Sequence, residues 1–245
     1  MERGLEPRVE GGRLYGRGAY DMKGGLAAIL LAAAEAQRRG LPGDVVVAAV
    51  ADEEHASLGT AAVLGRVRAD AAIVTEPTGM RVSIAHRGFA SFAVEVEGVA
   101  AHGSRPDLGV DAIARMGRVL AGIESLEREL SGRPPHPLLG RGSIHAGTIE
   151  GGEAYSVYPA RCRLTGERRT LPHETDGDAR AELAGILERA GERPDFRARL
   201  ALELARPAFA IDRAHPLVGH VRACAAAELG AEPGSPARRT GPTAA

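Results

Sequence analysis

The chain has 245 residues, enough for one large domain or two smaller ones. Hydrophobic residues make up 44% of it, so it can bury a core, and the formal net charge of -1 excludes the global basic field typical of nucleic-acid-binding proteins. No apolar run approaches the roughly 20 residues that span a bilayer, and residues 1–12 lack the apolar core of a signal peptide. We therefore expect a cytoplasmic protein with neither a nucleic-acid nor a membrane partner.

The first third of the chain alternates helix and strand patterns. In chain order we expect a loop at 1–12, the start of a strand at 14–15, a helix at 22–39, a strand at 45–50, a short helix at 60–66 and a strand at 71–74. The two apolar runs, VVVAAV at 45–50 and AAIV at 71–74, are typical of strands buried on both faces. This alternation predicts a parallel α/β sheet.

The pattern changes after residue 89, where Phe92, Val94 and Val96 alternate with more polar neighbours. In chain order we expect a strand at 92–97, a helix at 110–130, two strands at 143–149 and 160–168, a helix at 178–190 and a strand at 196–204. The order β-α-β-β-α-β is typical of a ferredoxin-like unit. We interpret it as a second domain inserted into the first, with helices on one face of its sheet and the other face or an edge free for a partner.

A helix predicted at 216–229 is expected to return to the first domain, and residues 230–245 to form a loose tail. The two cysteines, Cys162 and Cys224, lie in no CxxC motif. We expect both to be buried, inert thiols.

Acidic residues follow three of the predicted elements in the first domain. Asp21 lies where a glycine-rich loop meets a helix, Asp52-Glu53-Glu54 follow the first buried run, and Glu76 follows the second. In an open α/β sheet, sites form beyond the carboxyl ends of the strands, so these carboxylates would share one crevice. Divalent cations would relieve their repulsion, and one of two adjacent glutamates could remain a general base for a metal-bound water. For any single carboxylate, a solvated surface position is the alternative.

Four motifs occur together in the chain: GRGAYDMKGGLAA, ADEE followed by LGT, TEPT, and AHGSRPDLGVDAI. In this order and spacing they resemble the M20 metallopeptidase family, the group of acetylornithine deacetylases, succinyl-diaminopimelate desuccinylases and aminoacylases. The resemblance implies a zinc-peptidase-like, three-layer α/β catalytic domain at 1–82 and 205–245. It also implies an inserted ferredoxin-like βαββαβ dimerisation (lid) domain at 83–204, and hence a homodimer.

The resemblance also implies a role for each acidic residue. Asp21 would bridge two metal ions, with a cis peptide bond to Met22. Glu53 would be the general base that deprotonates the bridging water and passes the proton to the leaving amine. Glu54 would bind one metal and Glu76 the other.

Two residues of the inserted domain receive roles in the same way. His102 would reach the partner subunit's site and stabilise the tetrahedral oxyanion, and Arg169 in ERRTLP would hold the substrate's free carboxylate. A turn histidine and a solvated strand arginine are the alternatives. The family's GGxxxNxIP turn appears here as GGEAYSVYP, with Ser156 where asparagine is usual.

Two family histidine ligands have no counterpart in this sequence, one from an upstream HxD motif and one near the C-terminus. We therefore expect a chain truncated at both ends, whose two divalent metals (zinc expected, cobalt or manganese as alternatives) would lack their imidazole ligands. The implied function is metal-dependent hydrolysis of the amide bond of an N-acyl amino acid or small peptide. The alternatives are a dipeptidase or carboxypeptidase of the same family, and an inactive remnant that only dimerises.

Overall fold

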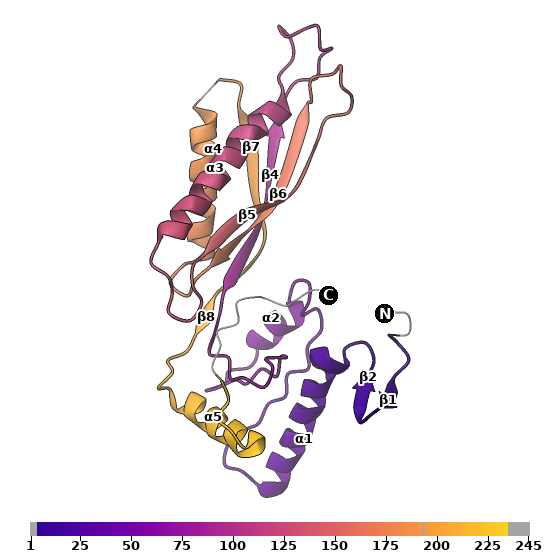
Figure 1. Cartoon of the computed structure of the whole chain (residues 1–245), viewed down its shortest axis with the longest axis vertical. Coiled ribbons are helices and arrows are strands. Elements are labelled where there is room, and N and C mark those ends of the chain that lie inside the picture. Colours follow the sequence, from indigo (N-terminus) through magenta and orange to yellow (C-terminus); the bar gives the residue numbers. More distant parts are fainter. Residues whose placement is uncertain (1–3, 193, 235–245) are drawn as a thin grey trace. The chain divides into compact units, whose positions relative to one another are not determined.

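A computed structural model describes residues 4–192 and 194–234 of the chain (Figure 1). They divide into two compact units: unit 1 contains residues 4–82 together with Pro216–Gly234, and unit 2 contains Ser83–His215. Within these described ranges, no helix is both long enough and apolar enough to cross a bilayer. Most of the tail predicted at 230–245 lies outside the described residues.

Unit 2 is built on a four-stranded antiparallel sheet with two helices. Its main elements are β4 (Gly88–Glu97), α3 (Ala112–Gly132), β5 (Ser143–Gly151), β6 (Arg161–Thr170), α4 (Asp176–Gly191) and β7 (Arg197–Arg206). The strands lie in the order β5-β6-β4-β7, and all neighbouring pairs are antiparallel. The predicted βαββαβ order is therefore confirmed. A small second sheet pairs β3 (Ala85–His86) with β8 (Phe209–Ala210).

The core of unit 2 lies between the sheet and the two helices. The alternating residues Phe92, Val94 and Val96 are buried, and they belong to one apolar cluster with Met116 of α3 and Leu183 of α4. Figure 1 shows α3 and α4 side by side on one face of the sheet. The period of two in the sequence thus marks the face that packs against the helices.

Side chains at the helix starts satisfy backbone groups that would otherwise lack partners. The Asp111 carboxylate accepts a hydrogen bond from the Ala114 amide at 2.9 Å at the start of α3. Thr175 and Asp178 form a reciprocal capping box at the start of α4. Both helices therefore begin where local sequence chemistry favours a start.

Gly166 on β6 lies against the ring of Phe92 on the neighbouring strand β4. A Cβ atom at this position would lie 2.5 Å from Cζ of Phe92, well inside van der Waals contact. The absence of a side chain at Gly166 is therefore what makes room for the phenylalanine ring.

Unit 1 contains a short hairpin and three helices. Its elements are β1 (Arg8–Glu10), β2 (Arg13–Tyr15), the irregular turn η1 (Ala19–Lys23), α1 (Gly24–Arg39), α2 (Leu58–Leu64) and α5 (Pro216–Leu229). The three predicted helices are confirmed, and α1 ends at Gly40, whose φ of 60° is left-handed as the sequence indicated. The predicted N-terminal loop was wrong in part, because it contains β1, which pairs with β2.

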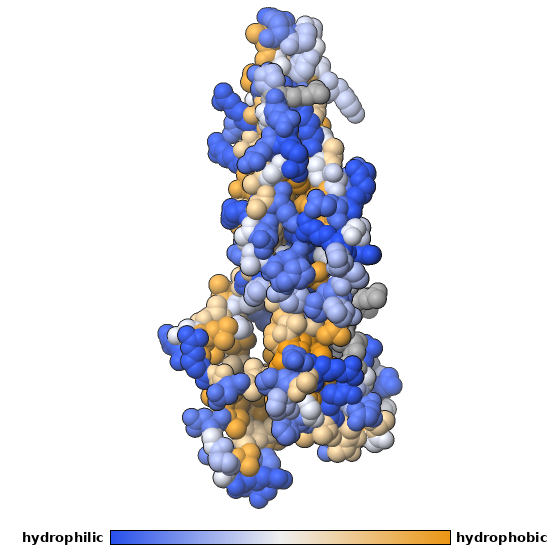
Figure 2. Space-filling model, turned by 90° about the vertical axis from the view of Figure 1, so that its left-hand side faces the viewer, coloured by the Kyte–Doolittle hydropathy of each residue, from blue (hydrophilic) through white to orange (hydrophobic). Residues whose placement is uncertain are grey.

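The two strands predicted at 45–50 and 71–74 are absent from the described structure, so these two predictions were wrong. Most of their residues are exposed, with 58% for Val46 and 72% for Val74. Figure 2 shows apolar surface on the part of the molecule that contains unit 1. A buried strand needs a neighbour on each side and a layer on each face, and the described residues provide neither here. The mixed α/β class is confirmed, but the described part of unit 1 contains no central parallel sheet.

The two cysteines differ in their surroundings. Cys162 on β6 is buried, as predicted, whereas Cys224 on α5 is exposed, so that prediction was wrong. The reason is that α5 buries only Val218 among its described residues. The helical periodicity predicted an inward-facing position for Cys224, but no element within the described part of the chain covers it.

Candidate active site

Asp21 lies in η1, immediately before α1. Its peptide bond to Met22 is cis, as the family resemblance implies. Both residues have non-helical backbone angles, so the chain changes direction here before the helix begins. The Asp21 side chain is exposed, and the neighbouring Lys23 ammonium donates to the Arg17 carbonyl at 2.8 Å, which closes the loop around it.

The start of α1 packs closely against the segment that carries Glu76. A Cβ atom at Gly25 would lie 2.6 Å from both the carbonyl oxygen and Oγ1 of Thr75. The Thr75 hydroxyl is buried and has no hydrogen-bond partner among the residues that the structure describes. The glycine therefore allows the loop after Asp21 and the residue before Glu76 to approach each other, a contact that the GG pair in the sequence only hinted at.

The acidic triplet forms a turn before α2. Asp52 has a left-handed φ of 64°, and its carboxylate accepts hydrogen bonds from the amides of Ala56 and Leu58, each at 3.2 Å. Asp52 therefore stabilises the turn and the start of α2. Glu53 and Glu54 are exposed in this turn.

The predicted metal ligands do not form a metal site in this structure. Residues 4–192 and 194–234 contain no group of three or more histidine, cysteine, aspartate or glutamate side chains that could share an ion. The donor set of Asp21, Glu54 and Glu76 therefore does not fit a metal centre as it stands. The sequence argument required two strands to bring their carboxyl ends together, and those strands are not formed at 45–50 and 71–74.

His102 lies in the connection between β4 and α3 of unit 2. Its Nδ1 accepts a hydrogen bond from the Ser104 amide at 3.2 Å and lies 2.8 Å from the Ser104 hydroxyl. With Nδ1 as an acceptor, the neutral ring carries its proton on Nε2. The exposed histidine can therefore donate a hydrogen bond from Nε2 to an anionic oxygen.

The GGEAYSVYP turn holds the His102 loop in place. The Gly103 amide donates to the Ser156 carbonyl at 2.6 Å, and the Tyr158 amide donates to the Ala101 carbonyl at 2.8 Å. Two motifs that are far apart in the sequence thus form one structural feature. The contact at Ser156 uses its backbone, so the replacement of the usual asparagine leaves this contact possible.

Arg169 lies on the face of the sheet opposite the helices. Its guanidinium carbon is 5.5 Å from the centroid of the Phe89 ring, and its Nε donates to the Glu167 carboxylate at 2.6 Å. The side chain is 27% exposed. Stacking and this one ion pair orient a planar donor group, which is the type of group that binds a carboxylate in two places.

Arg168, which sequence reasoning missed, points to the opposite side and is 1% exposed. Its guanidinium forms ion pairs with Glu174 at 2.7 Å and with Glu182 at 2.8 Å, and it also donates to the Arg169 carbonyl. Burial lowers the pKa of Arg168, but the hydrogen bonds and charges of Glu182 and Glu174 raise it by more. The pKa is therefore raised overall, and the group stays charged. The signal was present: Arg168 has the same strand parity as the buried Cys162 and Leu164.

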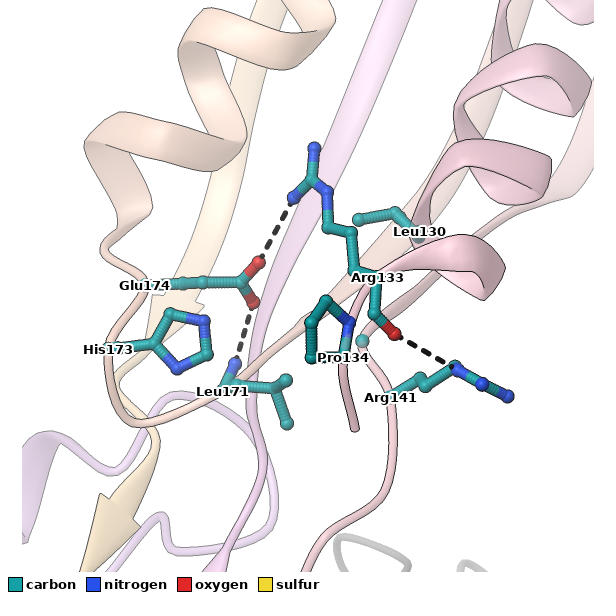
Figure 3. A pocket seen from close by; sticks show the side chains of 8 residues that line it. Leu130, Arg133, Pro134, Arg141, Leu171, His173 and Glu174 are labelled. Carbon is teal, nitrogen blue, oxygen red and sulfur yellow. Dashed lines mark hydrogen bonds and ion pairs between the residues drawn. The ribbon is translucent and has the colours of Figure 1, made fainter. Parts of the chain in front are cut away.

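Glu174 connects this buried cation to the backbone that follows β6. Its Oε2 accepts a hydrogen bond from the Leu171 amide at 2.8 Å, and its Oε1 also contacts Arg133 at 3.4 Å. Figure 3 shows these contacts at the edge of a pocket of about 220 Å³. The pocket is lined by Leu130, Arg133, Pro134, Arg141, Gly142, Leu171, His173 and Glu174.

The mixed α/β fold and these motifs agree with comparisons to known families. A family model described as "Peptidase family M20/M25/M40" matches residues 2–244. The chain therefore belongs to this family of hydrolytic enzymes, as the sequence motifs predicted.

Two relatives are named acetylornithine deacetylase. The protein from Myxococcus xanthus is 37% identical over 170 residues, which cover 66% of this chain and 43% of the relative. The protein from Klebsiella pneumoniae (strain 342) is 35% identical over 190 residues, which cover 74% of this chain and 48% of the relative. This chain thus spans about half the length of the curated relatives it matches.

Two solved structures share the fold. The aminopeptidase PepT of Bacillus cereus ATCC 10987 and a tripeptidase of Staphylococcus aureus each match with a TM-score of 0.73 and 19% identity. Each match covers 96% of this chain and 63% of the solved chain. At this identity the likeness concerns the fold alone.

Proposed function

We propose that this chain takes part in metal-dependent hydrolysis of the amide bond of N-acyl amino acids, as a deacetylase of the M20 family. The observation that carries the proposal is the 37% and 35% identity to proteins named acetylornithine deacetylase.

In this proposal Glu53 is the general base, and Asp21, Glu54 and Glu76 are the metal ligands, with Asp21 shared between two ions. Zinc is the proposed metal, and cobalt and manganese are the alternatives. The described residues hold no group of three such ligands. Metal binding is therefore the first property to measure.

Unit 2 would supply two further groups. The Nε2–H of His102 would donate a hydrogen bond to the oxyanion that develops on the scissile carbonyl. Arg169 would bind the substrate's free carboxylate, a task that suits its oriented guanidinium. We also propose that residues 83–204 act as the dimerisation lid, so that His102 serves the site of a partner subunit.

The test loads the purified chain with zinc, removes the excess by desalting, and measures the bound metal and the hydrolysis of N-acetyl amino acids. The proposal requires about two ions per chain, as a dinuclear site does. Glu53→Gln should retain the metal and lose hydrolysis, whereas Glu54→Gln should lose metal. The exposed Glu188→Gln is the matched control and should change neither.

A second candidate is a chain that dimerises without hydrolysing anything, and the absence of a metal group among the described residues favours it. No retained zinc together with a stable dimer in sedimentation would support this candidate and reject the deacetylase. Within the enzyme class, faster cleavage of dipeptides than of N-acetyl amino acids would reject deacetylation in favour of a peptidase.

A further inference from the structure

We infer that Arg168 and Glu174 are positioning residues for Arg169, and that they thereby set the preference for substrates with a free carboxylate. This inference rests on the proposed function, in which Arg169 binds that carboxylate. The structural basis is a buried ion pair whose two members each hold the backbone next to Arg169.

The first contact comes from Arg168, the residue that precedes Arg169 in the chain. Moving the Arg168 side chain would cost free energy, because it is 1% exposed and its charge is balanced by Glu174 and Glu182. From this fixed place its Nη1 donates to the carbonyl oxygen of Arg169. The peptide unit that follows Arg169 is therefore tied to a buried charge.

The second contact comes from Glu174, which follows Arg169 in the chain. The Glu174 side chain is 9% exposed, and its Oε2 accepts a hydrogen bond from the Leu171 amide at 2.8 Å. Together the two contacts fix the backbone from Arg169 to Leu171, where β6 ends. They act on the face of the sheet opposite the one on which the Arg169 guanidinium stacks on Phe89.

Glu182 provides a matched comparison. It also pairs with Arg168, at 2.8 Å, but it lies on α4, and among the described residues its carboxylate contacts Arg168 and Arg133 rather than the backbone of residues 169–171. Loss of either glutamate leaves Arg168 with one carboxylate. Only the loss of Glu174 removes a contact to the segment that carries Arg169.

The experiment compares Glu174→Ala with Glu182→Ala in the full chain. The first readout is the ratio of kcat/KM for an N-acetyl amino acid to kcat/KM for its carboxamide. We expect Glu174→Ala to lower this ratio by about tenfold, through KM for the acid, and Glu182→Ala to change it by less than about twofold. A general loss of stability would lower kcat/KM equally for both substrates and leave the ratio unchanged.

The second readout does not depend on catalysis. Hydrogen exchange of the amides in 168–174 should accelerate by about tenfold in Glu174→Ala, while the amides of 92–96 keep the wild-type rate. If Glu174→Ala does not fold, Arg168→Lys replaces it, since lysine lacks the fork that joins Glu174, Glu182 and the Arg169 carbonyl.

The outcomes separate the two proposals. A wild-type chain that hydrolyses neither substrate rejects the proposed function, and hydrogen exchange then decides the positioning role alone. Equal effects of the two glutamate variants on exchange in 168–174, or no effect of either, overturn the inference.

Discussion

The guanidinium of Arg168 and the carboxylate of Glu174 form an ion pair of 2.7 Å whose side chains are 1% and 9% exposed. Removal of one partner from such a pair leaves a buried charge without compensation. We expect Arg168→Met to lower the free energy of unfolding of unit 2 by about 3–5 kcal/mol. Urea unfolding followed by circular dichroism would measure this loss.

Arg163→Met is the control for this prediction, because Arg163 lies on the same strand. Its pair with Glu203 is 2.6 Å long, but the two side chains are 41% and 47% exposed. Solvent screens such a pair, so we expect a loss below about 1 kcal/mol. Equal losses in the two variants would show that the Arg168 network is not a special feature of the core.

Phe92 fills the centre of unit 2 and is fully buried. We expect Phe92→Ala to destabilise the unit by about 3–5 kcal/mol, because it removes apolar contacts and leaves a cavity. Ile113→Ala on the exposed side of α3, where the residue is 43% exposed, should cost less than about 0.5 kcal/mol. Thermal unfolding of both variants tests the location of the core, and a large effect at Ile113 would contradict it.

The capping box of α4 predicts a specific dependence on pH. Hydrogen bonds from the Thr175 amide and hydroxyl lower the pKa of Asp178 below its ordinary value. When the pKa of a carboxyl group is lower in the folded state, its ionised form stabilises the protein at pH values above the unfolded-state pKa. This contribution is lost as the pH falls through the folded-state pKa. Wild type should therefore be more stable than Asp178→Asn at pH 7, and the difference should shrink below about pH 4.

Denaturation curves of wild type and Asp178→Asn across this range provide the measurement. Thr175→Ala should cost about 1 kcal/mol at neutral pH, as is usual for the loss of an N-cap. A difference between wild type and Asp178→Asn that stays constant down to pH 2 would argue against the ionised cap.

The two cysteines should differ in reactivity. Burial, and to a lesser extent the charge of Asp111, raises the pKa of the Cys162 thiol, so less of it is thiolate at any given pH. Cys224 is exposed. With an aromatic disulfide reagent at pH 8, Cys224 should react at once and Cys162 only when unit 2 unfolds. Cys224→Ser should abolish the rapid phase, and rapid reaction in that variant would mean that Cys162 is accessible.

The sequence predicted unit 2 well because its patterns are local and complete. Phe92, Val94 and Val96 alternate along one strand, and the helices that cover them lie within the same hundred or so residues. The strand predictions at 45–50 and 71–74 failed for the opposite reason. An apolar run shows that a segment can be buried, but the neighbours that pair with it are not encoded in the run itself.

The candidate site divides along the same line. The motif around Asp21 correctly predicted a cis peptide bond, whereas the expected meeting of Asp21, Glu54 and Glu76 depended on strand pairing that the described residues lack. The Arg168 network was missed because its partner Glu182 comes from a separate helix. Strand parity gave the direction of the Arg168 side chain, but only the fold shows what it meets.

The contact between Gly166 and Phe92 constrains how this chain can evolve. A methyl group at Gly166 would collide with the phenylalanine ring, so the two positions cannot drift independently. A smaller side chain at position 92 would not by itself admit alanine or serine at 166, because a Cβ atom there would also collide with the backbone carbonyl oxygen of His145 on β5. Among relatives of this protein, glycine at the position of Gly166 should therefore be retained even where the residue at the position of Phe92 is smaller.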